Sequence, residues 1–460
     1  MSKATNKIDT VETTDLNLSG RSGLALFDKY LLNSGMIKLL ASDLSFLSQS
    51  KKGLSVENFI KQMGAYFIDG TNHRISQFDK LKADDAYAKL LGLKPEELGS
   101  SAAISRYFDK FNIGNCKKLK KSLKKIFRKV VSDFNGSVIV LTLDSMVLDN
   151  DDSNCKQGCT PSYKKVKGFH PLQLIVNGHI VSVSFRGGKT HGNCADTAKN
   201  MIIDAIKLIR EVKGANFPIV FNMDSGFMDQ KLFDAINEKN ANFICSGKKY
   251  QTIKDIVEGA ESADWHEYIV GKKTWAYYEF VSGCKSWADE YRTIYTYLSS
   301  NESGQYLLQF GDSESVIYTN IDSKQSEKSN IILNDEFRSC KSIIATFHSR
   351  GADELPHRAI KEFGSEILPF KKYHSNEAYY LLMVTFFNMY EFFKKDIIID
   401  KEFQTSYPNT IRRKFIDIAG YITTKSGKII LKINHAIATA TNFLEMWQKC
   451  CNISNLFLLE

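Results

Sequence analysis

The 460-residue chain has no apolar run that approaches the roughly 20 residues a membrane-spanning helix needs. Its first fifteen residues, MSKATNKIDTVETTD, contain no hydrophobic region of the kind found in secretory signals. Cysteine is sparse, and the nine cysteines are odd in number and irregularly placed. They therefore fit free thiols better than a disulfide framework. Internal repeats and low-complexity linkers are also lacking. We therefore expect a cytoplasmic protein with no membrane partner.

Charge is unevenly distributed along the chain. The formal net charge is +9, but residues 251–339 carry 15 acidic and 8 basic residues, so the remainder carries +16. A net charge of this size is consistent with a polyanionic partner and does not establish one. The segment from Lys117 to Lys129, KKLKKSLKKIFRK, holds eight cations around apolar residues at helical spacing. This basic helix is either solvated surface or a phosphate-binding element, in which case the candidates are Lys117, Lys118, Lys120 and Lys121.

The pattern of apolar residues predicts a mixed α/β chain built from several segments. A helical region occupies residues 1–133. Three antiparallel strands follow from Gly136, the last two joined by an Asn177-Gly178 turn, which is a strong hairpin signal. A helix, a strand, a second helix and a further strand come next, and this β-β-β-α-β-α-β order is that of the RNase H fold. We expect core segments at 134–250 and 345–400, a β-rich insertion at 251–344 and a C-terminal region at 401–460.

Two aspartates each stand where an apolar strand ends. Asp144 closes SVIVLTLD and Asp224 closes FPIVFNMD. In the predicted fold these two strands are neighbours, so both carboxylates emerge at one edge of the sheet, where open α/β sheets bind ligands. Magnesium takes carboxylate oxygens together with water and substrate phosphates, and a pair of ions can hold both reacting oxygens of a phosphoryl displacement. The aspartates therefore predict metal-dependent phosphoryl transfer.

A second group of polar residues lies at helical spacing near residue 350. Phe347, Arg350, Glu354 and Lys361 have the spacing F-x-x-R-x-x-x-E-x-x-x-x-x-x-K, and at about 100° per residue a helix places them within a sector of about 60°. Pro356 interrupts this pattern, because proline in a helix interior costs about 3 kcal/mol. We therefore predict that the helix starts near Asp353, with Pro356 in its first turn.

Taken in order, these motifs resemble the DDE transposases of bacterial insertion sequences, in the group marked by a Y-R-E-K signature and an RNase H-like core with a β insertion. The resemblance covers most of the chain and rests on motifs that follow the family order. These are SAAISRYFDKF, LTLDS, KGFHPLQLIVNG, FNMDSGF, the Phe347–Lys361 spacing and TIRRKFIDIAG. Phe347 departs from the signature tyrosine, losing a hydroxyl group but keeping a ring that can stack.

The resemblance implies a function and assigns residues to it. Asp144, Asp224 and Glu354 would hold Mg²⁺ ions, two in number, with Mn²⁺ as a substitute. Phe347, Arg350 and Lys361 would contact DNA near the scissile phosphate. The enzyme would bind the terminal inverted repeats of its element in double-stranded DNA, act as a homodimer or larger synaptic oligomer, excise the element and transfer its strands into target DNA.

Two other functions remain open from the sequence. One is a domesticated DNA-binding protein whose catalytic site is idle. The other is a metal-dependent phosphohydrolase with Asp144 as nucleophile, but Met146 stands where such an enzyme has a second aspartate.

Overall fold

The computed structural model describes residues 8, 10–48, 53–152, 155–190, 196–270, 272–300, 314–322 and 333–457, with the side chains of 270, 300 and 351–354 left outside this description. The chain forms two compact units. Residues 1–107 and 392–460 make the first, so the two ends of the chain belong together, and residues 108–391 make the second. The five segments expected from the sequence are therefore grouped differently here, and their bounds remain a proposal.

The first unit is mainly helical. Its helices before residue 108 are α1 (Leu24–Asn33), α2 (Met36–Asp43), α3 (Val56–Asp69), α4 (Gln77–Lys82), α5 (Asp85–Leu90) and α6 (Ser101–Phe108). Near the C-terminus lie α14 (Pro408–Ile411), α15 (His435–Ala440) and α16 (Phe443–Asn452). A small antiparallel sheet has the order β1 (Asn17–Ser19), β14 (Gly420–Lys425) and β15 (Lys428–Ile433). Strands β14 and β15 form a hairpin that turns at Ser426 and Gly427, and α16 contains Trp447.

Arg412, from the TIRRKFIDIAG motif, has a structural role within the first unit. Its side chain is only 4% exposed, and it donates hydrogen bonds to the carbonyl oxygens of Phe67 (2.7 Å) and Ile68 (2.8 Å) at the end of α3. Gly70 follows with a φ of +59°, and a Cβ there would lie 2.1 Å from the guanidinium carbon. The arginine therefore caps carbonyls that a helix end leaves without partners.

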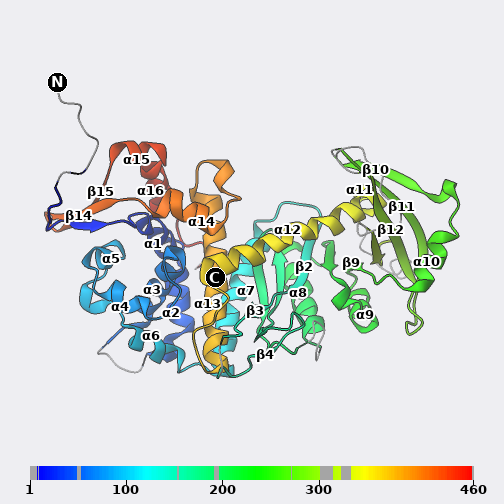
Figure 1. Cartoon of the computed structure of the whole chain (residues 1–460), viewed down its shortest axis with the longest axis horizontal. Helices are drawn as coiled ribbons and strands as arrows, with labels where there is room; N and C mark the ends of the chain where they lie inside the picture. The colour runs from blue at the N-terminus through cyan, green and yellow to red at the C-terminus, as the bar shows by residue number, and fades with distance from the viewer. Residues whose placement is uncertain are drawn as a thin grey trace. The chain divides into compact units, whose positions relative to one another are not determined.

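The second unit is built on one large mixed sheet (Figure 1). Among the described residues its strand order is β10-β11-β12-β13-β9-β8-β2-β6-β7. The strands are β2 (Ile139–Ser145), β6 (Leu172–Val176), β7 (His179–Ser184), β8 (Ile219–Met223), β9 (Asn242–Ser246), β10 (His266–Val270), β11 (Lys273–Ser282), β12 (Tyr291–Ser300) and β13 (Ser315–Thr319). Strands β2, β8 and β9 are parallel to one another, and the other pairings are antiparallel.

The predicted β-β-β-α-β-α-β order is present as β2, β6, β7, α8, β8, α9 and β9. Helix α8 (Thr197–Lys213) is followed by Gly214 at its C-terminal cap, and α9 (Gln230–Glu238) follows β8. Asn177 and Gly178 take φ values of 47° and 80° and make the predicted hairpin turn between β6 and β7. Three short strands between β2 and β6 were not predicted. They form a separate sheet of β3 (Leu148–Asp149), β5 (Lys167–Phe169) and β4 (Thr160–Pro161).

The β-rich insertion continues the large sheet, because β13 pairs with β9 over Thr319↔Ile244 to Ile317↔Ser246. Between β9 and the insertion strands lies α10 (Gln251–Glu258), and α11 (Asp335–Arg338) precedes the next long helix. Apolar side chains of the insertion share a core with that helix, α12 (Cys340–Gly364). Helix α13 (Tyr373–Ile397) contains the run AYYLLMVTFFNMYEFF and is almost wholly buried from Ser375 to Tyr390. No helix in the described part of the chain is long and apolar enough to cross a membrane.

The prediction that a helix starts near Asp353 was wrong. Helix α12 runs without a break from Cys340 to Gly364 with Pro356 in its interior, and Figure 1 shows it as one continuous helix beside the sheet. Apolar residues of this helix, including Ile343, Ile344 and Phe363, are fully buried. Burial of such side chains contributes about 1.5–3 kcal/mol each, which outweighs the cost of one proline.

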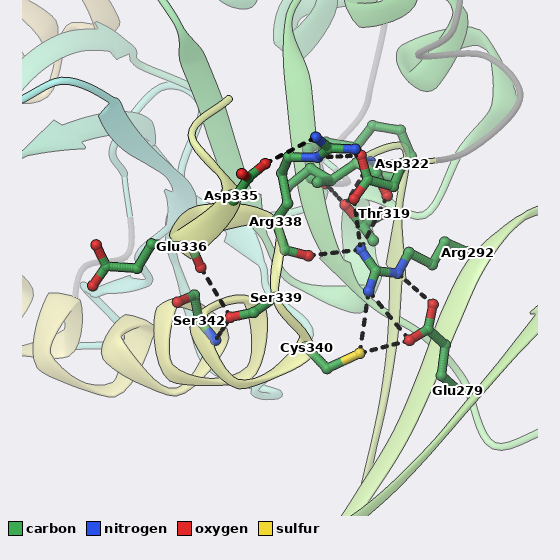
Figure 2. Close-up of polar contacts among 12 residues, drawn as sticks. Glu279, Arg292, Thr319, Asp322, Asp335, Glu336, Arg338, Ser339, Cys340 and Ser342 are labelled. Carbon is green, nitrogen blue, oxygen red and sulfur yellow. Dashed lines mark hydrogen bonds and ion pairs between the residues drawn. The ribbon is translucent and has the colours of Figure 1, made fainter. Parts of the chain in front are cut away.

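A network of polar contacts fixes the start of α12 to the insertion (Figure 2). Arg292 of β12 donates to Glu279 at 2.7 and 3.2 Å and to the carbonyl oxygen of Arg338 at 2.9 Å. The Cys340 thiol lies 2.8 Å from Glu279, and burial together with this carboxylate raises the pKa of the thiol to about 12. Arg338 in turn pairs with Asp322 at 2.7 Å. The first residues of α12 are thus held by charged partners of the insertion.

Candidate active site

The two predicted aspartates lie at the same edge of the large sheet. Strands β2 and β8 are parallel with Leu143 opposite Met223, so the next residue of each strand is Asp144 or Asp224. Asp144 Oδ1 accepts the amide of Ser145 at 2.7 Å, and Asp224 Oδ1 accepts the amide of Gly226 at 2.8 Å. These bonds orient the carboxylates at the strand ends. Both side chains line one cavity of about 760 Å³.

Helix α12 forms another wall of this cavity. Its contributing residues are Arg350, His357, Arg358, Lys361 and Glu362. Glu354 belongs to α12 by its backbone, whereas its side chain lies outside the described residues. Position 354 is four residues after Arg350 and three before His357, so it falls on the same helical face as both.

Arg350 is partly buried and its charge faces the cavity. The guanidinium carbon lies 5.4 Å from the ring centre of Phe347, one turn earlier. Its Nη1 atom is buried without a hydrogen-bond partner in the described part of the chain. A buried guanidinium nitrogen without a partner costs free energy, so this group is suited to an anionic ligand.

Phe347 was predicted to contact DNA, and its surroundings point first to another role. The ring is only 7% exposed and belongs to the core between the insertion and α12. In this position it supports the Arg350 guanidinium by packing against it. Direct stacking of Phe347 on DNA remains an untested prediction.

His357 was not singled out in the sequence, yet it lies beside Asp144. The distance from its Nδ1 atom to Asp144 Oδ2 is 3.8 Å. Burial, followed by the positive charges of Lys361 and Lys164, lowers the pKa of His357 to about 4. The imidazole is therefore neutral at pH 7. Its Nε2 atom is buried and has no hydrogen-bond partner among the described residues.

Lys361 lines the cavity as predicted from the helical spacing, but it is already paired. Its Nζ atom lies 2.7 Å from Glu366 Oε2, and both side chains are about one-third exposed. Glu366 is held near Asn150, whose Nδ2 atom donates to the Glu366 carbonyl oxygen at 2.9 Å. A phosphate that binds Lys361 must therefore compete with an internal carboxylate.

Among the described residues, the lining of the cavity combines four carboxylates with four cations. They are Asp144, Asp224, Glu362 and Glu366 with Lys164, Arg350, Arg358 and Lys361. Helical spacing from Glu354 contained a signal for His357, Arg358 and Glu362, since all lie within one or two turns of it. No comparable signal marked Glu366, Tyr163 or Lys164, which reach the cavity from loops.

The basic helix is α7 (Ile113–Ser132), and it has the predicted apolar face. Lys117, Lys118 and Lys121 are exposed, whereas Lys120 is half-buried and pairs with Glu377 at 2.9 Å. Together with β7 and α8, this helix borders a groove of about 380 Å³ lined by Lys117, Lys120, Lys121 and Lys124. Three of the four predicted lysines therefore lie on the exposed side of the helix.

A parallel pair of strand-end aspartates facing a helix with arginine and lysine side chains is an arrangement suited to phosphoryl transfer. The family comparison agrees with this chemistry, because the family model of the transposase DDE domain, group 1, matches residues 3–455. The chain belongs to this family of transposases, which are metal-dependent enzymes that cleave DNA and transfer its strands.

Further comparisons add little to this assignment. One similar solved structure is a piggyBac transposase synaptic complex with hairpin DNA. It shares 11% identity with this chain at a TM-score of 0.42, and the match covers 85% of this chain and 79% of that one. No curated protein matches the chain.

Proposed function

We propose that this transposase binds the terminal inverted repeats of its own element and moves that element by cleavage and strand transfer at the 760 Å³ cavity. The observation that carries the proposal is the parallel pairing of β2 and β8, which brings Asp144 and Asp224 to one cavity opposite the cations of α12. We further propose that the sheet is an RNase H-like core and that the protein belongs to the bacterial insertion-sequence group with a Y-R-E-K signature.

The donor set fits hard divalent cations. Asp144 and Asp224 offer carboxylate oxygens that open into the same space, and Glu354 stands on the facing helix surface. We propose that these three residues hold Mg²⁺ or Mn²⁺, with room for two ions. Bound ions of this kind supply Lewis-acid polarisation and activate water for attack on phosphorus.

Two cations of the cavity act directly on the DNA. The planar guanidinium of Arg350 grips two oxygens of the scissile phosphate, and Lys361 contributes a point charge once Glu366 releases it. His357 lies beside Asp144 as a neutral ring and adds no positive charge there. Strand transfer needs the same groups, since it is again a displacement at phosphorus, with a DNA 3′-hydroxyl group as the nucleophile.

Affinity for the duplex comes from elsewhere on the surface. We propose that the α7 lysines contact the phosphate backbone of terminal-repeat DNA, which the protein binds as a homodimer or larger synaptic oligomer. Replacing Lys117, Lys118 and Lys121 with glutamine should weaken binding and lower the slope of log K against log salt by about 0.9 for each phosphate that is no longer neutralised. An unchanged slope would assign α7 to solvated surface.

Cleavage of a duplex carrying the terminal repeat that flanks the coding region tests the catalytic assignment. Asp144→Asn, Asp224→Asn and Glu354→Gln should each abolish cleavage, and the wild type should lose activity when divalent metal is removed. Asp335→Asn is the matched control, because that carboxylate is 98% exposed and lies outside the cavity. Near-normal cleavage by any of the three variants would refute the triad. A wild type that binds the repeat without cleaving it would favour the idle-site alternative.

A further inference from the structure

The start of α7 and the start of α13 contact each other in the second unit through a group of metal-ligating side chains (Figure 1). Cys116 of α7 and His374 and Glu377 of α13 each offer one ligand atom, and these three atoms all lie within 4.8 Å of one another. His374 and Glu377 are three residues apart, a spacing that places both side chains on one face of a helix. The Cys116 Sγ atom lies 3.5 Å from the carbonyl oxygen of His374. Two helices therefore bring a thiol, an imidazole and a carboxylate together.

This group is held in place by contacts that do not involve the ligand atoms. Ser375 Oγ donates to the Phe108 carbonyl oxygen at 2.9 Å, and Lys372 pairs with Asp109 at 3.0 Å. Both contacts join the start of α13 to residues just before α7. Rigid elements joined in this way hold a site close to its binding geometry before a ligand arrives.

The donor set suits Zn²⁺. Cysteine sulfur, histidine nitrogen and carboxylate oxygen are its usual ligands, with bonds of about 2.0–2.3 Å. Tetrahedral coordination with such bonds separates the ligand atoms by about 3.3–3.7 Å, so the observed spacing requires only small side-chain movements. The His374 Nδ1 atom already lies 3.0 Å from Glu377 Oε2. Cys116 and Glu377 are buried, whereas the His374 side chain is 35% exposed, so the imidazole side offers a route of entry from solvent.

We propose that Cys116, His374 and Glu377 bind one Zn²⁺ ion that joins α7 to α13, with water completing its coordination. The site is separate from the cleavage cavity, whose described lining contains none of these residues and whose carboxylates favour Mg²⁺. Coordination replaces the thiol proton, which leaves for solvent, so the ion, the thiolate and the carboxylate together carry no net charge. The ion fastens the basic helix to the buried helix of the core.

Lys120 is the competitor of the ion. Its Nζ atom lies 2.9 Å from Glu377 Oε1, and its side chain is 38% exposed. The ammonium group balances the charge of this buried carboxylate, and an incoming dication must displace it toward solvent. Lys120→Gln should therefore tighten metal binding by about 5-fold, which is the contribution of a partly exposed ion pair.

Binding of Co²⁺ alone tests the site, because a thiolate bound to Co²⁺ gives a charge-transfer band in the near ultraviolet. The parent protein for this titration has no affinity tag and carries Asp144→Asn and Asp224→Asn, so that the cleavage cavity contributes little binding. We expect one Co²⁺ per chain, displaced by Zn²⁺. Cys116→Ser should abolish the band. Cys450→Ser is the matched control and should retain it, because this thiol is also buried and lies 3.4 Å from a backbone carbonyl oxygen, that of Leu26.

Two further measurements test the remaining ligands and the link between the helices. His374→Ala should weaken Co²⁺ binding by more than the roughly 10–100-fold that loss of an outer-shell partner costs. Zn²⁺ at 100 times its Kd should raise the melting temperature of the parent by about 3–5 °C and leave that of Cys116→Ser unchanged.

Several outcomes would overturn the site. They are a parent without a thiolate band at saturating Co²⁺, a band that survives in Cys116→Ser, and equal affinity of the parent and His374→Ala. Any of these would leave the group as a set of internal polar contacts around the Lys120–Glu377 ion pair. A melt in the presence of chelator verifies that each variant folds, and the partly exposed His374 carries the test if Cys116→Ser does not fold. These measurements use no DNA, so their result is independent of the proposed function.

Discussion

The start of α12, Cys340–Phe347, differs from the part of the helix that begins at Arg350 in how its polar groups are paired. At the start, Cys340 and the preceding Arg338 contact Arg292, Glu279 and Asp322, so the charges of this region are paired within the protein. In the part from Arg350 onward, Arg350 itself has a buried nitrogen without a partner in the described residues. Buried polar groups are normally paired, and the exceptions call for a functional explanation.

One helix thus packs against the insertion at its start and lines the candidate site further along. The start of α12 is fixed by the insertion through polar contacts and a shared core, and it sets where the part from Arg350 onward lies. A further bond comes from Asn222 of β8, whose Nδ2 atom donates to the Thr346 carbonyl oxygen at 2.7 Å. Asn222 is two residues before Asp224, so this bond connects the helix directly to the strand that leads to the candidate carboxylate Asp224.

The largest effect on the rate of cleavage should follow from substitution of Arg350. Arg350→Ala should slow cleavage of pre-bound DNA by a factor on the order of 100, as expected for removal of a preorganised charge at a reacting phosphate. Arg350→Lys should also be slow, because lysine lacks the planar fork that packs against the Phe347 ring. Single-turnover cleavage measured beside a binding titration checks both variants.

Arg358→Ala is the control for Arg350→Ala. Arg358 lies on the same helix, but its side chain is 69% exposed and already pairs with Glu362 at 3.3 Å. Its removal should have a much smaller effect on the rate. If Arg350→Ala weakens binding and rate equally, this arginine only anchors DNA. The difference in pairing between the start of α12 and Arg350 then has no role in catalysis.

An intermediate effect should follow from a change that breaks the anchor. Removing one partner of a buried ion pair costs about 3–5 kcal/mol, but Glu279 is 42% exposed, so we expect about 2 kcal/mol for Arg292→Met. This corresponds to roughly 30-fold faster hydrogen exchange of the amides that open with the start of α12. Exchange mass spectrometry of peptides covering Cys340–Phe347 measures it.

Arg338→Met tests whether every charge in the network around the start of α12 stabilises this end of the helix to the same degree. Arg338 is itself more exposed than Arg292, 39% against 11%, and its partner Asp335 is 98% exposed, so exchange at Cys340–Phe347 should change little. If the two variants accelerate exchange equally, Arg292 has no special role in anchoring the helix. If neither does, the apolar core alone holds this end.

The sequence predicted the sheet better than the helix that faces it. Alternating apolar runs and the Asn177-Gly178 turn are local signals, and they were sufficient for the order of elements along the chain. The expectation that Asp144 lies beside Asp224 came from the RNase H fold that this order matches. Pro356 led to the wrong prediction of the helix start, because the free-energy cost of a proline can be judged from local sequence. The compensating burial of Ile343, Ile344 and Phe363 depends on tertiary packing. The pairing of β13 with β9 was not visible either, since nothing in a strand's own sequence specifies a partner far away along the chain.

The candidate site was predictable to the same extent as its secondary structure. Residues at regular spacing on α12 could be placed together, and Arg350 and Lys361 do line one cavity with the aspartates. Tyr163 and Lys164 could not be assigned to the cavity from the sequence, because they reach it from the tip of a hairpin made of very short strands. Glu366 was not predicted for a related reason. It follows the end of α12, outside the regular helical spacing, and its carboxylate contacts Lys361.

The smallest effect should come from releasing Lys361. Glu366→Gln removes the carboxylate that holds this lysine at 2.7 Å, and exposed ion pairs contribute little to stability, so the fold should be unaffected. One additional cation then becomes available to DNA, which should tighten binding and make the slope of log K against log salt steeper by up to about 0.9. Asp335→Asn makes the same change in charge outside the cavity without releasing Lys361, so it should leave the slope nearly unchanged. If both variants steepen the slope equally, the effect is one of total charge. If the double variant Glu366→Gln/Lys361→Gln returns to the wild-type slope, the steeper slope of Glu366→Gln is due to Lys361. In that case Glu366 keeps a cation of α12 paired until DNA binds.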